Sequence, residues 1–289
     1  MQAKKPAFVS AIGFVSGLAS VVGYATWQRP IAAASPPTLG LLLIASRVGP
    51  TVPTTTSIAS WTISTILGVV FAEGLSLALR SPSDFAYAGF YASALAFFHF
   101  SEFLTTSVYN PTKLTLDSYL LNHSKEYVGA AVISWIEFGL EYLLVPRLKS
   151  LTFVSMLGLI FVVFGEVLRK VAMCTAGSNF SHVIAYRKAR NHELVTHGVY
   201  SLCRHPSYVG WFYWSIGTQL VLVNPLCVVF YAIVSWKFFK ERIEDEDMTL
   251  LLFFRKEYYD YQRRVGTGLP FIDGHRLTSK EMTELGIDE

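Results

Sequence analysis

Long apolar segments separated by short polar turns are the feature that most constrains this chain. Most of them approach the roughly 20 residues that a helix needs to cross the hydrocarbon core of a bilayer. In chain order the segments are Ala7–Trp27, Pro36–Ser46, Thr56–Leu79, Phe85–Val108, Tyr127–Val145, Leu151–Val167, Tyr208–Val223 and Leu226–Phe239. Pro36–Ser46 is too short to cross alone and is expected to be a kinked or tilted partner of the first span. The sequence therefore predicts an all-α integral membrane protein with about eight transmembrane helices.

Charge is scarce and unevenly distributed. Charged residues make up 16% of the chain, against about 25% in an ordinary soluble domain. Residues 1–175 hold 19 of the 45 charges, whereas residues 237–289 hold 21. This distribution excludes an ordinary soluble domain and a disordered chain. It predicts an N-terminal membrane region of about six spans over residues 1–175. The C-terminal region, residues 176–289, is predicted to contain a polar connector, a final helical hairpin over 208–239 and a C-terminal helix.

The remaining composition excludes several classes of partner. A net charge of +3 without a basic stripe gives no support for nucleic-acid binding. The three cysteines have no metal-ligand spacing, so we expect free thiols and no metal site. The first apolar segment has the form of either a signal peptide or a retained span. A retained span is favoured because further apolar segments follow. The partner that we expect for the protein as a whole is the lipid bilayer.

The positive residues predict the orientation of the chain in the membrane. An even number of spans places both termini on one side, and the positive-inside rule assigns that side to the cytosol. Arg147 and Lys149 go against this pattern. The loop Asn110–Glu126 carries leucines and a tyrosine among polar residues, which is typical either of a short interfacial helix or of an ordinary ordered loop.

Six ionisable residues lie inside the apolar segments, where charge is expensive and therefore often functional. They are Glu73, His99, Glu102, Glu137, Glu141 and Glu166. For most of them a role in helix pairing is sufficient. His99 and Glu102 share one face of their helix and are expected to form a polar bridge or part of a cavity wall.

The most informative stretch of the sequence runs from residue 192 to residue 210. Gly198 can turn the chain, and Pro206 suits the first turn of the following helix. Arg204, His205 and Tyr208 are therefore expected to gather at the polar entrance of the final hairpin. The backbone N–H groups of Ser207 and Tyr208 are expected to face that entrance and to be able to receive an anionic group.

A second polar cluster, Glu241–Asp247, follows the hairpin. On a continuing helix, Arg242 and Glu246 lie one turn apart on the same face. The hairpin turns tightly at Asn224-Pro225, so both polar clusters are predicted to meet at the same face of the membrane. Either cluster alone is also consistent with a membrane-surface anchor or a solvated helix end. Their convergence favours a functional site.

These residues carry a family resemblance. Arg204–Gly210 and Glu241–Glu246, separated by the hairpin, resemble the C-terminal signature of the isoprenylcysteine carboxyl methyltransferases. The segments Thr175–Phe180, Gly210–Gln219 and Thr267–Ile272 resemble the animal members of that family. The detailed likeness covers roughly residues 170–275.

The resemblance implies an enzyme of the endoplasmic reticulum membrane, with both termini in the cytosol. Such an enzyme methylates the C-terminal carboxylate of a farnesyl- or geranylgeranyl-cysteine on CaaX-processed proteins such as small GTPases, with S-adenosylmethionine as the cofactor. Arg242 is then expected to face the substrate carboxylate as the catalytic and substrate-binding residue. The cofactor pocket is expected to comprise His192, Glu193, Leu194, Val195, Tyr200, His205, Pro206, Ser207, Tyr208 and Glu246.

Three alternatives remain open at this stage. A phospholipid methyltransferase or a sterol reductase shares the wider signature, although the strings Gly210–Gln219 and Thr267–Ile272 argue against both. A non-catalytic lipid-binding or transport protein would tolerate the loss of Arg242.

The segment Phe253–Arg264 is interpreted as an amphipathic helix that caps the cofactor, or alternatively as a peripheral membrane anchor.

Overall fold

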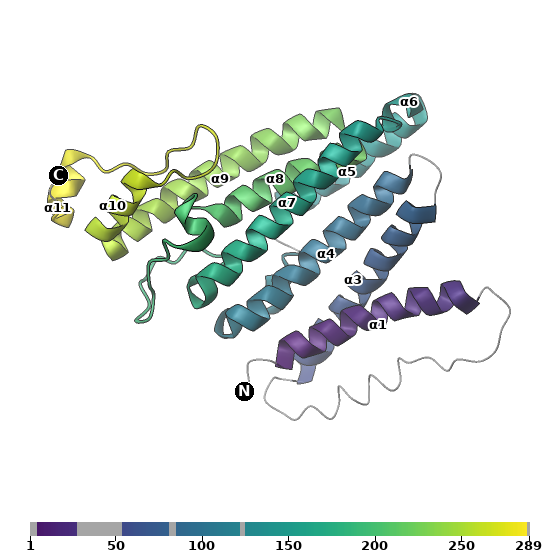
Figure 1. The fold of residues 1–289 in the computed structure, drawn as a ribbon, viewed down its shortest axis with the longest axis horizontal. Coiled ribbons are helices and arrows are strands. Elements are labelled where there is room, and N and C mark those ends of the chain that lie inside the picture. Colours follow the sequence, from purple (N-terminus) through teal and green to yellow (C-terminus); the bar gives the residue numbers. More distant parts are fainter. Residues whose placement is uncertain (1–4, 28–53, 81–84, 122–124, 288–289) are drawn as a thin grey trace. The chain divides into compact units, whose positions relative to one another are not determined.

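The computed structural model describes residues 5–27, 54–80, 85–121 and 125–287, and their regular secondary structure is helical, with no β-strand among them (Figure 1). The α-helices are α1 (Lys5–Trp27), α3 (Thr54–Arg80), α4 (Phe85–Tyr109), α5 (Lys125–Leu144), α6 (Pro146–Lys149), α7 (Thr152–Ala176), α8 (Pro206–Leu222), α9 (Pro225–Phe254), α10 (Lys256–Arg264) and α11 (Ser279–Leu285). Single 3₁₀ turns are η2 (Pro111–Lys113), η3 (Leu116–Tyr119), η4 (Gly177–Asn179) and η5 (Gly198–Ser201). The segment Pro36–Ser46 lies outside the described residues.

Three helices in the described part of the chain are long and apolar enough to cross a membrane. They are Ser57–Arg80, Glu126–Leu144 and Thr152–Asn179, and Pro6–Val21 is a shorter apolar helix. The membrane-helical class that the sequence predicts is therefore confirmed, whereas a count of eight spans stays a prediction.

One boundary differs from the sequence-based expectation, and one open alternative is decided. The span predicted to end at Val167 continues as α7 to Ala176, because the buried Arg169 finds a hydrogen-bond partner in Ser207 and packs against the Trp211 ring. Of the two interpretations left open for the loop Asn110–Glu126, the structure supports the ordered loop, because its described residues form only the 3₁₀ turns η2 and η3. Pro111 starts η2, and Leu120 adopts a left-handed conformation (φ 57°) that ends η3, so no continuous helix forms there.

The described residues divide into two compact units. The first comprises residues 1–159 with 218–225, and the second comprises residues 160–217 with 226–289. In the first unit α1, α3 and α4 pack through small residues, as membrane helices commonly do. A Cβ added to Gly13 would lie 2.6 Å from the Trp61 carbonyl oxygen, so only glycine allows this approach of α1 to α3. The Tyr119 hydroxyl donates to the Ser60 carbonyl at 2.9 Å and ties η3 to α3.

A buried lysine closes the turn between α8 and α9. The side chain of Lys149 is 1% exposed. Its Nζ, with three N–H donors, lies within 3.0 Å of four acceptors: Glu141 Oε2, the carbonyl oxygens of Leu222 and Val223, and Asn224 Oδ1. The ammonium thus satisfies carbonyl groups that the end of α8 leaves unpaired. This buried, paired role explains why Lys149 departs from the positive-inside pattern.

We predict that Lys149→Met lowers the thermal unfolding temperature of the detergent-solubilised protein by several degrees. Breaking a buried ion pair from one side costs about 3–5 kcal/mol, because Glu141 and the α8 carbonyls lose their donor. Thermal unfolding followed by size-exclusion chromatography measures the change. Arg147→Met is the matched control, because Arg147 lies on the same short helix and is exposed. Equal unfolding temperatures for the two variants would contradict this role of Lys149.

Candidate functional site

One pocket in the second unit gathers the residues that the sequence singles out as a cofactor site. All ten expected positions line it: His192, Glu193, Leu194, Val195, Tyr200, His205, Pro206, Ser207, Tyr208 and Glu246. Eight further residues complete the wall: Ala176, Asn179, Phe180, Ser181, Arg204, Leu250, Tyr258 and Tyr261. The pocket thus draws on the end of α7, the connector, the start of α8, and the helices α9 and α10.

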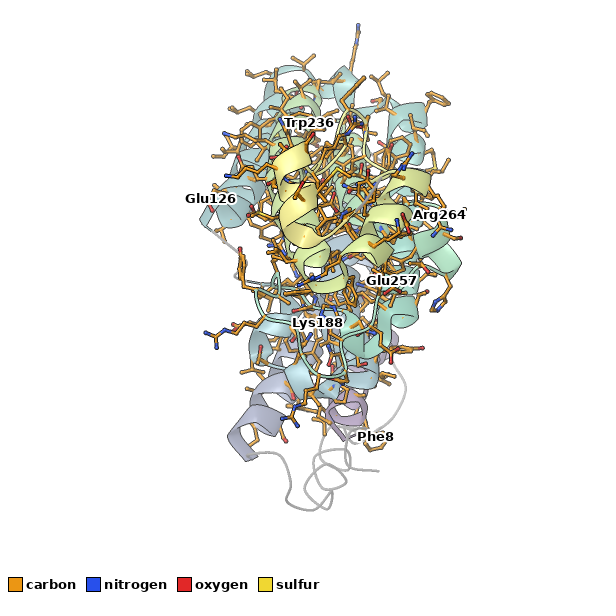
Figure 2. The ribbon with its side chains drawn as sticks, turned by 90° about the vertical axis from the view of Figure 1, so that its left-hand side faces the viewer. Phe8, Glu126, Lys188, Trp236, Glu257 and Arg264 are labelled. Carbon is orange, nitrogen blue, oxygen red and sulfur yellow. The ribbon has the colours of Figure 1, made fainter. Side chains whose placement is uncertain are left out.

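The connector between α7 and α8 has little regular structure and is held by side-chain contacts. Asn179 Oδ1 accepts the backbone N–H of Glu193 at 3.0 Å, which joins the two arms of the connector. Lys188, labelled in Figure 2, donates to the Phe253 carbonyl at 2.9 Å. The Tyr261 hydroxyl donates to the Tyr200 carbonyl at 2.5 Å. These bonds attach the connector to the end of α9 and to α10, which is how distant segments form one wall.

Asp247 is the centre of a buried ionic cluster behind this wall. Its side chain is fully buried, and each carboxylate oxygen accepts two donors. Oδ1 accepts from His205 Nε2 at 2.8 Å and from the Tyr258 hydroxyl. Oδ2 accepts from Arg204 Nη2 at 3.0 Å and from Gln262 Nε2 at 3.3 Å. One carboxylate therefore binds the connector to α9 and α10. In the sequence Asp247 is one of several acidic residues in the cluster Glu241–Asp247, and nothing there singles it out.

The cluster sets the charge of His205. Burial alone would lower its pKa, but the charge and hydrogen bond of Asp247, together with those of Glu246, raise the pKa to about 9. Burial would raise the pKa values of Glu246 and Asp247, but the hydrogen bonds and charge of His205 hold both below their usual values. His205 is thus an imidazolium at neutral pH, with Nδ1 3.6 Å from Glu246 Oε2.

We predict that the protein loses stability as the pH rises from about 6.5 to 9. The pKa of His205 is higher in the folded state than its ordinary 6.5, so its contribution is complete below pH 6.5 and is lost as the pH rises through about 9. The contribution is on the order of 3 kcal/mol. Thermal unfolding of the detergent-solubilised protein across this pH range measures it.

In that experiment His205→Gln should flatten the pH dependence of the unfolding temperature. His197→Gln, which replaces an exposed histidine of the same connector, should leave the dependence unchanged. An unaltered pH slope in His205→Gln would exclude this histidine as its source.

The two polar clusters meet across the hairpin, as predicted. Besides the contacts of His205 with Glu246 and Asp247, Arg242 reaches the start of α8. Its Nε and Nη2 donate to the Tyr208 hydroxyl at 3.4 Å, and Nη2 donates to the His182 carbonyl at 3.0 Å. Its guanidinium carbon lies 5.5 Å from the Tyr208 ring centre and 5.6 Å from that of Phe238. Arg242 does not line the pocket itself but contacts Tyr208, which does.

The start of α8 is held by α7. Arg169, which is buried, donates to Ser207 Oγ at 2.7 Å, and its guanidinium carbon lies 4.7 Å from the Trp211 ring centre. A Cβ on Gly210 would lie 2.6 Å from the Gly165 carbonyl oxygen, so α7 and α8 cross in close backbone contact. Nothing in the sequence marks Arg169 as a partner of α8, because Arg169 follows the apolar segment of α7 and its partner Ser207 lies in a different segment.

One expectation about this helix start is wrong. The backbone N–H of Tyr208 donates to the His205 carbonyl at 3.0 Å, so it is not available to an anion. Pro206 directs the chain into a helical turn whose first hydrogen bond uses this group. Of the two backbone N–H groups expected to receive an anion, that of Ser207 remains a candidate.

The C-terminal amphipathic helix is shorter than predicted. α9 continues without interruption to Phe254, and α10 begins only after Arg255, whose φ of 47° breaks the helix. α10 turns Tyr258 and Tyr261 toward the pocket, where both line the wall. The position of this segment is thus consistent with the expectation that it covers the pocket. The end of α9 and α10 together form the segment, in place of one helix.

The pocket is narrow in this structure. Its volume is about 100 Å³, smaller than the roughly 300–1,000 Å³ of typical small-molecule sites. The connector and α10 supply most of its wall, and side-chain contacts hold them in place.

A membrane-length helix, α7, ends at a polar pocket, and this arrangement defines a membrane protein with a site for a polar or charged ligand. Three comparisons narrow this class. The model of the isoprenylcysteine carboxyl methyltransferase family matches residues 156–252. The chain is 57% identical over 211 residues to protein-S-isoprenylcysteine O-methyltransferase of Rattus norvegicus, covering 73% of this chain and 74% of the relative. The enzyme of the same name from Saccharomyces cerevisiae is 42% identical over 215 residues, covering 72% and 89%.

A solved structure agrees with these sequences. The structure of a eukaryotic intramembrane Ras methyltransferase of this family superimposes with a TM-score of 0.83 at 42% identity, covering 94% of this chain and 99% of that one. The chain belongs to the isoprenylcysteine carboxyl methyltransferase family. It is therefore an enzyme, a methyltransferase of the membrane.

Proposed function

We propose that this enzyme transfers a methyl group from S-adenosylmethionine to the C-terminal carboxylate of a farnesyl- or geranylgeranyl-cysteine on CaaX-processed proteins such as small GTPases. The observation that carries the proposal is the convergence of the connector and α9 on one pocket, with Arg242 beside it. Membership in the family supports the same activity. No feature of the described residues favours a sterol reductase or a phospholipid methyltransferase.

The residues of the pocket fit the proposed cofactor. S-adenosylmethionine, when bound, supplies a methyl group on a positively charged sulfur. Arg204 lines the pocket, and its buried Nε has no hydrogen-bond partner among the described residues, so it can donate to the cofactor's carboxylate. Glu246 is ionised and suits a ribose hydroxyl, an amino group or the positive sulfur. Phe180, Tyr200 and Tyr258 offer aromatic surface for the adenine ring.

The proposed acceptor needs orientation rather than activation. A C-terminal carboxylate has a pKa near 3.5, so it is already ionised at cytosolic pH and needs no general base. Catalysis then depends on positioning the reacting atoms. A guanidinium can grip a carboxylate with two parallel hydrogen bonds. Arg242 packs against the rings of Tyr208 and Phe238, and these contacts restrict its guanidinium and suit this orienting role.

The substrate also accounts for the membrane. A prenyl chain gains about 0.8 kcal/mol per buried CH₂ group and therefore stays in the bilayer, while the cysteine carboxylate requires a polar environment. The site must then lie at the membrane interface. The apolar part of α9 passes directly into the charged turn that carries Arg242 and Glu246, so one helix connects the two environments.

We extend the proposal to the whole chain. Residues 1–175 form the membrane scaffold, and residues 176–289 carry the connector, the final hairpin and the catalytic residues. With about eight spans, both termini and the pocket lie on the cytosolic side of the endoplasmic reticulum membrane. The distribution of lysines and arginines along the sequence supports this orientation.

We predict that Arg242→Ala lowers kcat for carboxyl methylation at least 100-fold while the affinity for S-adenosylmethionine changes less than threefold. The reason is that Arg242 lies outside the cofactor pocket and is assigned to the acceptor. Methyl transfer from labelled S-adenosylmethionine to N-acetyl farnesylcysteine measures turnover. Lys240→Ala is the matched control, because Lys240 is an exposed cation on the same helix. Turnover at the wild-type rate in Arg242→Ala would refute the proposal. Methylation of phosphatidylethanolamine by the wild-type enzyme, with no methylation of the prenylcysteine, would also refute it.

We predict that Glu246→Gln weakens S-adenosylmethionine binding about tenfold. The substitution keeps the shape of the side chain but removes the negative charge that faces His205 and the pocket. Equilibrium binding to the purified enzyme measures the affinity, and Glu244→Gln on the same helix serves as the control. An unchanged dissociation constant in Glu246→Gln would remove this residue from the cofactor site.

A further inference from the structure

A second concave surface lies on the second unit and shares Arg204 with the candidate cofactor pocket. We call it the C-terminal groove, and it is formed by α10, the loop Val265–Asp273, Tyr213 of α8 and Arg276. Its volume is about 1120 Å³, larger than most small-molecule sites. Neither the candidate cofactor pocket nor the position of Arg242 accounts for this groove.

The loop in the groove presents an aromatic side chain to the outside. Phe271 is 95% exposed, while its neighbours Leu269 and Ile272 are buried at 5% and 4% exposure. Its φ of 61° lies in the left-handed region, which is unfavourable for a bulky residue. A conformation of this kind persists only where the surrounding structure enforces it, and it is a common sign of a functional position.

The surrounding bonds show what enforces it. Thr267 Oγ1 donates to the Ile272 carbonyl at 2.5 Å and closes the loop. The indole N–H of Trp236 donates to the Pro270 carbonyl at 2.8 Å and fastens the loop to α9. The backbone N–H of Arg204 donates to the Gly266 carbonyl at 2.9 Å. These three bonds define the conformation in which Phe271 points outward.

Trp236 also gives the level of the loop relative to the membrane. It lies near the end of the apolar segment 226–239, just before Lys237 and Lys240, and tryptophan at such a position is typical of the membrane–water interface. The bond from Trp236 to Pro270 places the loop at the same level. An exposed phenylalanine there can enter the acyl region of the bilayer instead of facing water.

Basic side chains line the other part of the groove. Arg263, Arg264 and Arg276 are exposed, and among the described residues Arg276 alone of the three has a carboxylate partner, Asp273 at 2.9 Å. Arg263 lies over the Tyr259 ring, and Arg264 Nε donates to the Asp260 carbonyl. Arg263 and Arg264 thus form a positive pair at the end of α10 (Figure 2 labels Arg264). Arginine is well suited to bind phosphate.

We propose that the C-terminal groove binds an anionic phospholipid, with the phosphate at Arg263 and Arg264 and an acyl chain beside Phe271 and Tyr213. The orientation in this proposal rests on the proposed function, which places this end of the chain at the cytosolic leaflet, where anionic lipids attract basic residues. Lipid binding itself does not depend on the methyl-transfer reaction. The two are therefore tested separately.

A bound lipid would act on the candidate active site through Arg204. Arg204 lines both the cofactor pocket and the groove, and its side chain joins Asp247 to the carbonyls of Val265 and Asp273. A lipid that restrains the loop and α10 would restrain the same residues that close the pocket. The site would couple membrane composition to cofactor binding.

The test measures lipid binding to the full-length enzyme in detergent by native mass spectrometry, with dioctanoyl phosphatidylserine and dioctanoyl phosphatidylcholine as probes. The wild-type protein should bind the anionic lipid at least tenfold more tightly. Arg263→Gln/Arg264→Gln should abolish this preference. Phe271→Ser should weaken both lipids about fivefold. Lys256→Gln, an exposed cation on α10 outside the groove, should bind like the wild type.

The same experiment can overturn the proposal. Equal binding of the two lipids by the wild-type protein, or an unchanged preference in the double arginine variant, would refute it. Full displacement of phosphatidylserine by 10 mM inorganic phosphate would identify a free-phosphate site instead of a lipid site. Each variant must keep the wild-type unfolding temperature, and Arg263→Glu/Arg264→Glu provides a second variant that must also lose the preference. Methylation activity is not used as a readout, so failure of the proposed reaction leaves this result unaffected.

Discussion

The carboxylate of Asp247 is the interaction on which the site depends. A buried carboxylate is expensive unless its charge is compensated and its lone pairs are used. Here Arg204 and His205 supply the charge, and Tyr258 and Gln262 supply the remaining hydrogen bonds. These donors come from the connector and from α10, so satisfying one charge on α9 brings three segments together. The same compensation keeps His205 protonated, and it lets a connector with little regular structure hold a defined shape.

The combination of apolar membrane segments and a polar site in one chain follows from the chemistry of the family. A substrate with a hydrocarbon chain and an ionised carboxylate needs a protein that offers both environments within a few ångströms. α9 meets this need because its apolar first half continues without a break into the turn that carries Arg242, Glu246 and Asp247. The connector and α10 supply most of the wall of the candidate cofactor pocket, so their side-chain contacts determine its shape.

Much of the candidate site could be predicted from the sequence. The hairpin around Asn224-Pro225 predicted the meeting of His205 with Glu246, because a tight turn between two apolar segments of similar length returns the chain to the same level. The ten expected pocket residues were found through the family resemblance, and the structure places them around one cavity. The role of Asp247 could not be predicted, because its place in a run of acidic residues gives no sign of which carboxylate is buried. Arg169 was equally hidden, since its partners Ser207 and Trp211 lie about 40 residues away.

The sequence by itself determined the membrane-helical class, the positions of most helices and the convergence of two polar clusters. These properties depend on local composition and on chain connectivity, both of which can be read along the sequence. Only the tertiary structure decided which charges are buried, where α7 and α9 end, and how the loop Val265–Asp273 holds Phe271 outward. Those outcomes depend on partners distant in sequence, such as Trp236 for the loop and Leu222 for Lys149. A buried charge is stable only where such partners surround it, and no single segment specifies them.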